Sequence, residues 1–217
     1  MRRSLWLVVV ALLGAMGTAT AQAPKEASDA PTVPALNDVR PEILRVVIDD
    51  QWDRGNDMFG GRQVKPADHL DWQAIAQRDQ QRQLSIRSLL AEGKVQTGRE
   101  FHFAALIFQH SAAADDLTLA HVLAVSAVIQ GDPSAKWLAA ATLDRYLQNQ
   151  KSPQVFGTQF GRDSDDTKWT MDPYDRKALP DSVRALWCVI SQSDQQEALK
   201  ALQEGKGGAN TTVRECN

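Results

Sequence analysis

The chain has 217 residues, of which 43% are hydrophobic and 24% are charged, and its formal net charge at pH 7 is -3. This composition is that of a globular protein with one or two domains, and it excludes collagen-like, coiled-coil and wholly disordered chains. The isoelectric point near 5.8 leaves no surplus of Lys and Arg to neutralise phosphates, so we expect no nucleic-acid partner.

The first 21 residues have the three parts of a secretory signal peptide. Arginines at positions 2 and 3 precede an apolar stretch over residues 5–13, and a small-residue pattern (ATA) at 19–21 offers a cleavage site. We therefore predict a periplasmic or secreted protein that is cut after Ala21. Because the apolar stretch is shorter than the about 20 residues of a membrane span, we expect no stable membrane insertion after cleavage.

Composition divides the rest of the chain into a linker, one domain and a tail. Residues 22–36 are predicted to be a disordered linker, because the three prolines and small polar residues within 24–35 cannot bury enough apolar surface to order the chain. We predict a single helical domain over 37–204 and a C-terminal tail over 205–217.

Two cysteines, Cys188 and Cys216, remain after cleavage. Two thiols in one small exported domain more often form a disulfide than stay free. The bridge would close a loop of about 28 residues, stabilise the fold by roughly 3 to 4 kcal/mol and hold the tail. A reactive thiol is the alternative, but the chain has no Cys-x-x-Cys motif to lower a thiol pKa.

Apolar residues at helical spacing predict a mainly α fold. Pro41 begins the first helix, which runs to about Arg54, because the fixed φ and missing N–H of proline suit the first helical position. Glycines and N-cap residues mark the ends of the others. These are predicted at about residues 68–90, 97–111, 115–131, 132–148, 181–190 and 194–204.

The fourth and fifth helices are predicted to form a helical hairpin. Asp115 or Asp116 is the expected N-cap of the fourth helix. Asp132 is the expected N-cap of the fifth, with Pro133 at its first helical position.

After the fifth helix the residue pattern changes from helical periodicity to short β-prone segments. Two short β-prone segments, 155–160 and 168–171, predict a small β-hairpin or an irregular loop near residues 155–171. The predicted architecture is a bundle of helical hairpins, solenoid-like but without a fixed repeat period.

Four charged side chains fall on or beside apolar helix faces. Asp79 and Arg82 lie three residues apart on the apolar stripe of the second helix, and Asp144 lies on that of the fifth with Arg145 beside it. Burial of such groups costs free energy unless they are paired. They are interpreted either as internal ion pairs that fix the helix register or as the lining of a pocket.

Three histidines also lie on or near apolar helix faces. His102 and His121 are each expected to bond one carbonyl or carboxylate. His110 differs, because it follows Gln109 at a helix C-terminus next to a turn, where other elements can converge. Zinc binding by the three is disfavoured, since their spacing lacks the i, i+4 pair of a helical zinc motif. No metal or cofactor is therefore assigned.

The segment 154–160 (QVFGTQF) places a glycine and two hydrogen-bonding side chains, Thr158 and Gln159, between aromatic residues. Such a segment is typical of a loop that presents polar groups from an apolar base. It is equally compatible with the turn of a hairpin, and the sequence leaves both interpretations open.

A combination of short polar motifs runs through the predicted domain. The residues are Gln109-His110, Leu143-Asp144-Arg145 and Gln154-x-Phe156-Gly157-Thr158-Gln159, with Asp79-Gln80-x-Arg82 upstream and Asp172-Pro173 downstream. This combination, over residues 70–190, resembles an uncharacterised family of bacterial proteins with Gln-His, Asp-Arg and Gly-Thr-Gln signatures. The chain departs from it at Ser111, where Ala is usual, and at Phe156, where Tyr is usual. The resemblance implies which residues matter and brings no established activity.

Two classes of function follow from these residues. In the first, the chain is an exported helical binding or interaction module, and ion pairs of Asp79, Arg82, Asp144 and Arg145 order the Gly-Thr-Gln loop. Its partner is then a protein or a small-molecule ligand that the sequence does not identify.

In the second class, the chain is a hydrolase-like or ligand-modifying enzyme. His110 would be the general base, Asp144 would orient its second ring nitrogen, and Arg145, Thr158 and Gln159 would hold an anionic or amide-bearing substrate. Because the sequence has no Gly-x-Ser-x-Gly elbow and no phosphate-binding loop, we take the binding module as the leading hypothesis and the enzyme as the alternative. A solvent-reachable cleft at these residues would favour the enzyme, and a sealed cluster the module.

Overall fold

The computed structural model describes residues 36–56, 70–162 and 168–206. Contacts divide the chain into a unit of residues 1–35 and a unit of residues 36–217. The predicted signal peptide, almost all of the predicted linker and Cys216 lie outside the described residues. Their predictions therefore stay predictions.

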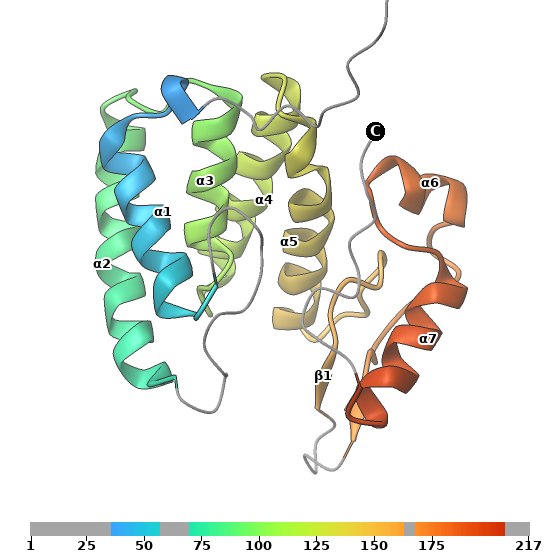
Figure 1. Cartoon of the computed structure of the whole chain (residues 1–217). Coiled ribbons are helices and arrows are strands. Elements are labelled where there is room, and N and C mark those ends of the chain that lie inside the picture. Colours follow the sequence, from blue (N-terminus) through green and yellow to red (C-terminus); the bar gives the residue numbers. More distant parts are fainter. Residues whose placement is uncertain (1–35, 57–69, 163–167, 207–217) are drawn as a thin grey trace, which may run out of the picture. The chain divides into compact units, whose positions relative to one another are not determined.

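Helices make up most of the described chain (Figure 1), as the sequence predicts. The α-helices are α1 (Pro41–Asp53), α2 (Trp72–Ala91), α3 (Gly98–Phe108), α4 (Ala114–Ile129), α5 (Lys136–Asn149), α6 (Asp181–Leu186) and α7 (Gln192–Gln203). Short 3-10 helices cover Leu36–Asp38 and Pro133–Ala135. Strands β1 (Gly161–Arg162) and β2 (Trp169–Thr170) pair antiparallel, with Gly161 opposite Thr170. The predicted mainly α fold with a small β-hairpin is confirmed.

Helix starts follow the capping rules at several places. Pro41 is the first residue of α1, and the side chain of Asp71 accepts a hydrogen bond from the backbone of α2. Thr97 and Glu100 form a reciprocal capping box at the start of α3. These local bonds satisfy backbone N–H groups that have no partner inside the helix.

Two predicted N-caps need correction. The N-cap of α4 is Ala113, so Asp115 and Asp116 lie in its first turn, where negative charge stabilises the positive end of the helix dipole. Asp116 accepts hydrogen bonds from Ser111 and Arg87 instead of capping the helix. Asp132 does cap, but it caps the 3-10 turn Pro133–Ala135 that precedes α5.

Small residues allow α3, α4 and α5 to pack closely. Ala120, Ala124 and Ala127 of α4 are fully buried, and α4 contacts both α3 and α5 (Figure 1). At Gly98 a Cβ atom would lie 2.8 Å from the carbonyl oxygen of Gln130, so glycine permits the start of α3 to touch the end of α4. The main core extends to α1 and α2 through buried residues such as Ile43, Val47 and Ile86.

The chain after α5 packs against that helix through a second apolar cluster of Ala140, Phe156 and Val189. The β-prone segment 155–160, for which the sequence left a hairpin and an irregular loop open, is a loop, and β1 begins only at Gly161. The physical reason is that backbone N–H groups in this loop donate to a carboxylate of α5 and not to a partner strand. Among the described residues, no helix combines the length and apolar character needed to cross a bilayer.

Candidate functional site

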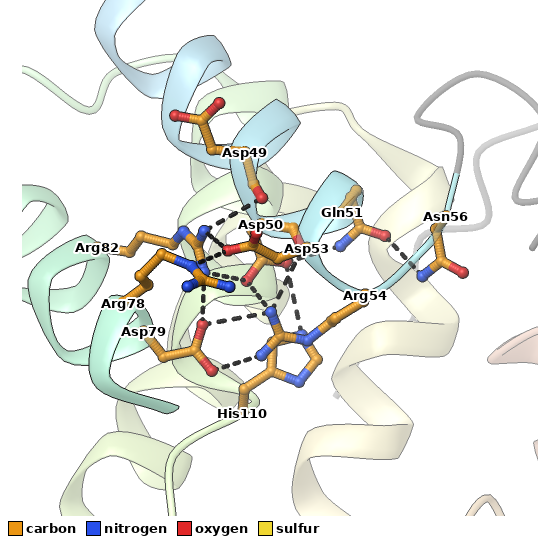
Figure 2. Close-up of polar contacts among 10 residues, drawn as sticks. All are labelled: Asp49, Asp50, Gln51, Asp53, Arg54, Asn56, Arg78, Asp79, Arg82 and His110. Carbon is orange, nitrogen blue, oxygen red and sulfur yellow. Dashed lines mark hydrogen bonds and ion pairs between the residues drawn. The ribbon is translucent and has the colours of Figure 1, made fainter. Parts of the chain in front are cut away.

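Charged side chains of α1 and α2 form a network that we call the ion-pair cluster, made up of Asp50, Asp53, Arg54, Asp79 and Arg82 (Figure 2). Arg54 bridges two carboxylates, since its Nη1 lies 2.6 Å from Asp50 Oδ1 and its Nη2 lies 2.6 Å from Asp79 Oδ2. Arg82 donates to Asp79 over 2.8 Å and also to Asp53. The predicted pairing of Asp79 with Arg82 is thus present, inside a larger network.

Sequence reasoning missed three members of this cluster, Asp50, Asp53 and Arg54. A signal for two of them was present, because Asp50 and Arg54 continue the stripe of Ile43 and Val47 at i+7 and i+11. The same periodicity brings Asp79 and Arg82 onto the core face of α2. Two charged positions on each of two adjacent helices predict such a network.

Burial dominates the electrostatics of Asp50, which is only 1% exposed. Desolvation raises the pKa of Asp50 from its ordinary value near 3.8 to about 6, although the neighbouring charge of Arg54 acts in the opposite direction. Asp50 also accepts a hydrogen bond from Gln51 over 2.8 Å. This carboxyl therefore titrates closer to neutral pH than an ordinary aspartate.

A hollow of about 290 Å³ lies beside the ion-pair cluster, and we call it the polar pocket. It is open to solvent and is lined by the turn after α3, the C-terminal half of α5, one residue of α4 and the loop after α5. Its lining residues are Gln109, His110, Ser111, Leu117, Arg145, Gln148, Asn149 and Gln159. Three of the predicted ligand-binding candidates, Gln109, Arg145 and Gln159, therefore meet here together with His110.

Arg145 differs from the other arginines of the interior. Its Nε is buried without a hydrogen-bond partner, as Nη2 of Arg184 also is, but within the described ranges the guanidinium of Arg145 forms no ion pair, whereas Arg184 pairs with Asp181. Arg54 and Arg82, by contrast, each bind two carboxylates. Burial, and secondly the charge of Arg54, lower the pKa of Arg145. A guanidinium is thus held in the wall of the pocket without a counter-charge of its own.

His110 joins the polar pocket to the ion-pair cluster (Figure 2). Its Nε2 lies 3.7 Å from Asp50 Oδ2, which is too far for a hydrogen bond, and this nitrogen is buried without a partner. Burial and the nearby charges of Arg54, Arg145 and Arg82 lower the pKa of His110 well below its ordinary value. The imidazole is therefore neutral at pH 7, with its second nitrogen on the side of the ring away from Asp50.

Asp144 faces a different part of the molecule from its sequence neighbour Arg145. Its carboxylate is fully buried and accepts four hydrogen bonds, from the N–H groups of Val155, Phe156 and Thr158 and from the Thr158 hydroxyl, over 2.8 to 3.0 Å. The enzyme hypothesis gave Asp144 the task of orienting His110, but these bonds commit it to the loop. The carboxylate nearest the imidazole is that of Asp50.

The ion-pair network predicted for the binding module also needs correction. Asp79 and Arg82 belong to the ion-pair cluster, whereas Asp144 and Arg145 do not. Asp144 orders the loop through hydrogen bonds and not through an ion pair. The physical reason is direction, since Asp144 points from α5 toward the loop and Arg145 toward the pocket.

The Gly-Thr-Gln loop is shaped by its fit against later elements. Gly157 has φ +80°, and a Cβ atom there would lie 2.6 Å from the side chain of Gln195 and 2.7 Å from that of Tyr174, so only glycine fits. The hydroxyl of Thr158 donates a hydrogen bond to Asp144 and accepts one from the side chain of Gln159. Of the two loop candidates, only Gln159 lines the polar pocket.

The remaining histidines have separate partners. His102 Nδ1 lies 3.1 Å from Asp132 Oδ2, and His121 Nδ1 lies 2.9 Å from the carbonyl oxygen of Ala139. In the part of the chain that the structure describes, no three His, Cys, Asp or Glu side chains gather as metal ligands. His102 lies on α3, His110 in the turn after α3 and His121 on α4.

No family model matches the chain, and no curated protein or solved structure matches it either. The resemblance to an uncharacterised bacterial family therefore stays a prediction. Cys188 is buried at 3% exposure, and its predicted bond to Cys216 stays a prediction because Cys216 lies outside the described residues.

Proposed function

We propose that the chain is an exported α-helical binding module that holds a small polar ligand in the polar pocket. The observation that carries this proposal is the lack of internal partners at the pocket wall. Arg145 has a buried Nε without a hydrogen bond and no ion pair in the described ranges, and the side chain of Gln109 forms no hydrogen bond there. Buried polar groups are normally satisfied, so such a concentration of unsatisfied groups supports a ligand.

The ion-pair cluster supports the same proposal as a rigid wall behind the pocket. Two contacts hold the end of α1 against α2: Arg54 Nη2 lies 2.6 Å from Asp79 Oδ2, and Arg82 donates to Asp53. Ligand sites are more precise when the groups that face the ligand are held by a second set of bonds. The cluster would thereby keep His110 in position in the turn that follows α3.

A pocket-filling variant tests the binding function. Gln148 lines the pocket on α5, whereas Gln150 is exposed two residues later. We expect that compounds from a panel of small polar metabolites raise the melting temperature of the wild type and of Gln150→Trp but not of Gln148→Trp, because the indole would occupy the pocket. Equal responses of the two variants, or no response of the wild type to any compound, would refute binding in this pocket.

A ligand-modifying enzyme is a second candidate, because His110, Arg145 and Gln159 of the enzyme hypothesis line the pocket, although Asp144 and Thr158 are buried and hydrogen-bonded to each other. His110 lines the pocket as a neutral imidazole, which is the protonation state that can accept a proton from a bound compound. Incubation of a compound found in the panel with the wild type and with His110→Gln, followed by NMR of the compound, tests it. Turnover that is lost in His110→Gln would support the enzyme, and an unchanged compound would leave the binding module.

Export is part of the proposal and has its own test. The arginines at positions 2 and 3, the apolar stretch 5–13 and the ATA pattern at 19–21 support it. After expression of the full chain in a bacterial host with a periplasm, we expect the periplasmic fraction to contain a protein that begins at Gln22. Alkylation and intact mass measurement of the same sample would show whether Cys188 and Cys216 are bonded. A protein that keeps Met1 and stays in the cytoplasm would contradict export.

A further inference from the structure

We infer that the ligand of the polar pocket carries a carboxylate, and that this carboxylate binds the guanidinium of Arg145. The inference rests on the proposed binding function and specifies the chemical class of the ligand. Gln109, His110 and Gln159 line the same hollow, and the ligand would lie among them.

The charge balance around the pocket supports an anion. The three carboxylates of the ion-pair cluster are matched by Arg54 and Arg82 inside it and by Arg78 at its edge, which lies 2.6 Å from Asp53. Arg145 adds one further positive charge with no acidic partner in the described ranges. A partly buried charge without a partner is costly, so a ligand that neutralises it gains more than it would at an exposed arginine.

The presence of one unpaired positive side chain at the pocket favours a carboxylate ligand over a phosphate. Arg54 and Arg82 are saturated by aspartates, so Arg145 is the single guanidinium at the pocket with donors to spare. One guanidinium matches the one charge and two coplanar oxygens of a carboxylate through a bidentate bond. A phosphate carries more charge and would need further cations, whereas the other pocket groups are neutral amides and a neutral imidazole.

The pocket size limits the rest of the ligand. A hollow of about 290 Å³ is at the small end of the roughly 300–1,000 Å³ typical of ligand pockets. The amide of Gln109 is able both to donate and to accept a hydrogen bond, whereas the Gln159 side chain already donates to Ala141 and Thr158 and has its oxygen left as an acceptor. The ligand is therefore a small carboxylate with polar substituents and not a fatty acid, because Leu117 is the single apolar side chain among the lining residues.

NMR of the arginine side chain tests the inference directly. In 15N-labelled protein, the Nε–Hε signal of Arg145 is assigned by its absence in Arg145→Gln and is followed during titration with sodium acetate at constant ionic strength. We expect saturable shifts of this signal with acetate, little change with chloride, and smaller changes with inorganic phosphate.

The matched control is Arg45→Gln, which removes the same charge from an exposed position on α1. We expect Arg145→Gln to weaken acetate binding, followed by backbone amide signals of the pocket, by about tenfold or more, since a charged hydrogen bond contributes about 1.5 to 3 kcal/mol. Arg45→Gln should change it by less than about twofold, because exposed charges act weakly through screened solvent.

The outcomes separate this inference from the binding function. If acetate leaves the Arg145 signal unmoved, or if phosphate moves it at lower concentration than acetate does, the carboxylate assignment is wrong. A compound that stabilises the wild type but not Gln148→Trp, without moving the Arg145 signal, would leave the binding function intact and overturn this inference alone. Failure of both experiments would overturn both proposals.

Discussion

Asp144 and Arg145 are consecutive residues of α5, and their side chains have opposite degrees of saturation. The carboxylate of Asp144 accepts four hydrogen bonds from one loop. The Nε of Arg145 is buried without a partner. On one helix, therefore, a charged group with all its hydrogen-bond partners inside the fold lies next to a charged group that lacks such partners.

The difference teaches how to separate architecture from function among buried charges. A buried carboxylate that accepts four hydrogen bonds is satisfied without any ligand, so its role is to stabilise the fold. A guanidinium without an acceptor is costly in the free protein, and binding of an anion relieves that cost. The ion-pair cluster belongs with Asp144, and the polar pocket belongs with Arg145.

The largest effect is expected at Asp144. In Asp144→Asn one acceptor oxygen becomes an NH2 group that faces N–H or O–H donors of the loop, so we expect a loss of about 3 to 5 kcal/mol in the free energy of unfolding. Urea denaturation measures it, with Asp115→Asn as an exposed control on α4 expected to change stability by no more than about 0.5 kcal/mol. A loss below 1 kcal/mol would show that the loop does not depend on this carboxylate.

The ion-pair cluster gives the next effect. Arg54→Gln removes the shared partner of Asp50 and Asp79 and should lower the free energy of unfolding by about 3 kcal/mol, since breaking a buried pair leaves uncompensated charge. The matched control Arg45→Gln makes the same substitution at an exposed position of α1, the helix that ends just before Arg54. Equal stabilities of the two variants would show that the ion pairs of Arg54 do not stabilise the fold.

Local rules predicted much of this fold. Proline at the start of α1 and the periodic apolar faces gave the helices to within a few residues, because helix starts and helix faces depend on neighbours in sequence. The loop at 155–160 was open between two interpretations. Its conformation depends on Asp144 and on Gln195, which lie outside the loop in sequence and act only through tertiary contact.

The candidate site was predictable in part for the same reason. Gln109, His110, Arg145 and Gln159 were found because polar groups at apolar or loop positions are unusual, and they line one pocket. The partner of His110 was misassigned to Asp144, since spacing along one helix does not give the direction of a side chain. Arg54 and its network were missed although the periodicity of α1 contained them.

The pH dependence of stability tests the contact between Asp50 of the ion-pair cluster and His110 of the polar pocket. Burial raises the pKa of Asp50 to about 6 in the folded protein, so the folded state keeps a proton that the unfolded state releases near pH 4. This contribution is present below pH 4 and is lost as pH rises through about 6. Burial lowers the pKa of His110, so its contribution is present above pH 6.5 and is lost as pH falls below that value.

The two contributions oppose each other between pH 4 and 6.5, and single variants separate them. Relative to wild type, His110→Gln should lose stability as pH rises from 4 to 6, because the wild type gains stability over this range as protonation of His110 in the unfolded state becomes less favourable, and the variant does not. Asp50→Asn should instead gain stability as pH rises over the same range. Urea denaturation at several pH values measures both slopes, and slopes of the same sign would mean that the two groups do not titrate as their burial requires.

The smallest effect in magnitude is expected at Arg145, and its sign is the informative part. Arg145→Gln removes a partly buried charge that lacks a partner, so the free energy of unfolding should stay the same or rise by about 1 kcal/mol, in contrast to the loss at Arg54. Urea denaturation in chloride buffer without carboxylates measures it. A loss as large as that of Arg54→Gln would place Arg145 among the structural arginines, whereas a gain in stability would mark the free guanidinium as a group held in place for a ligand.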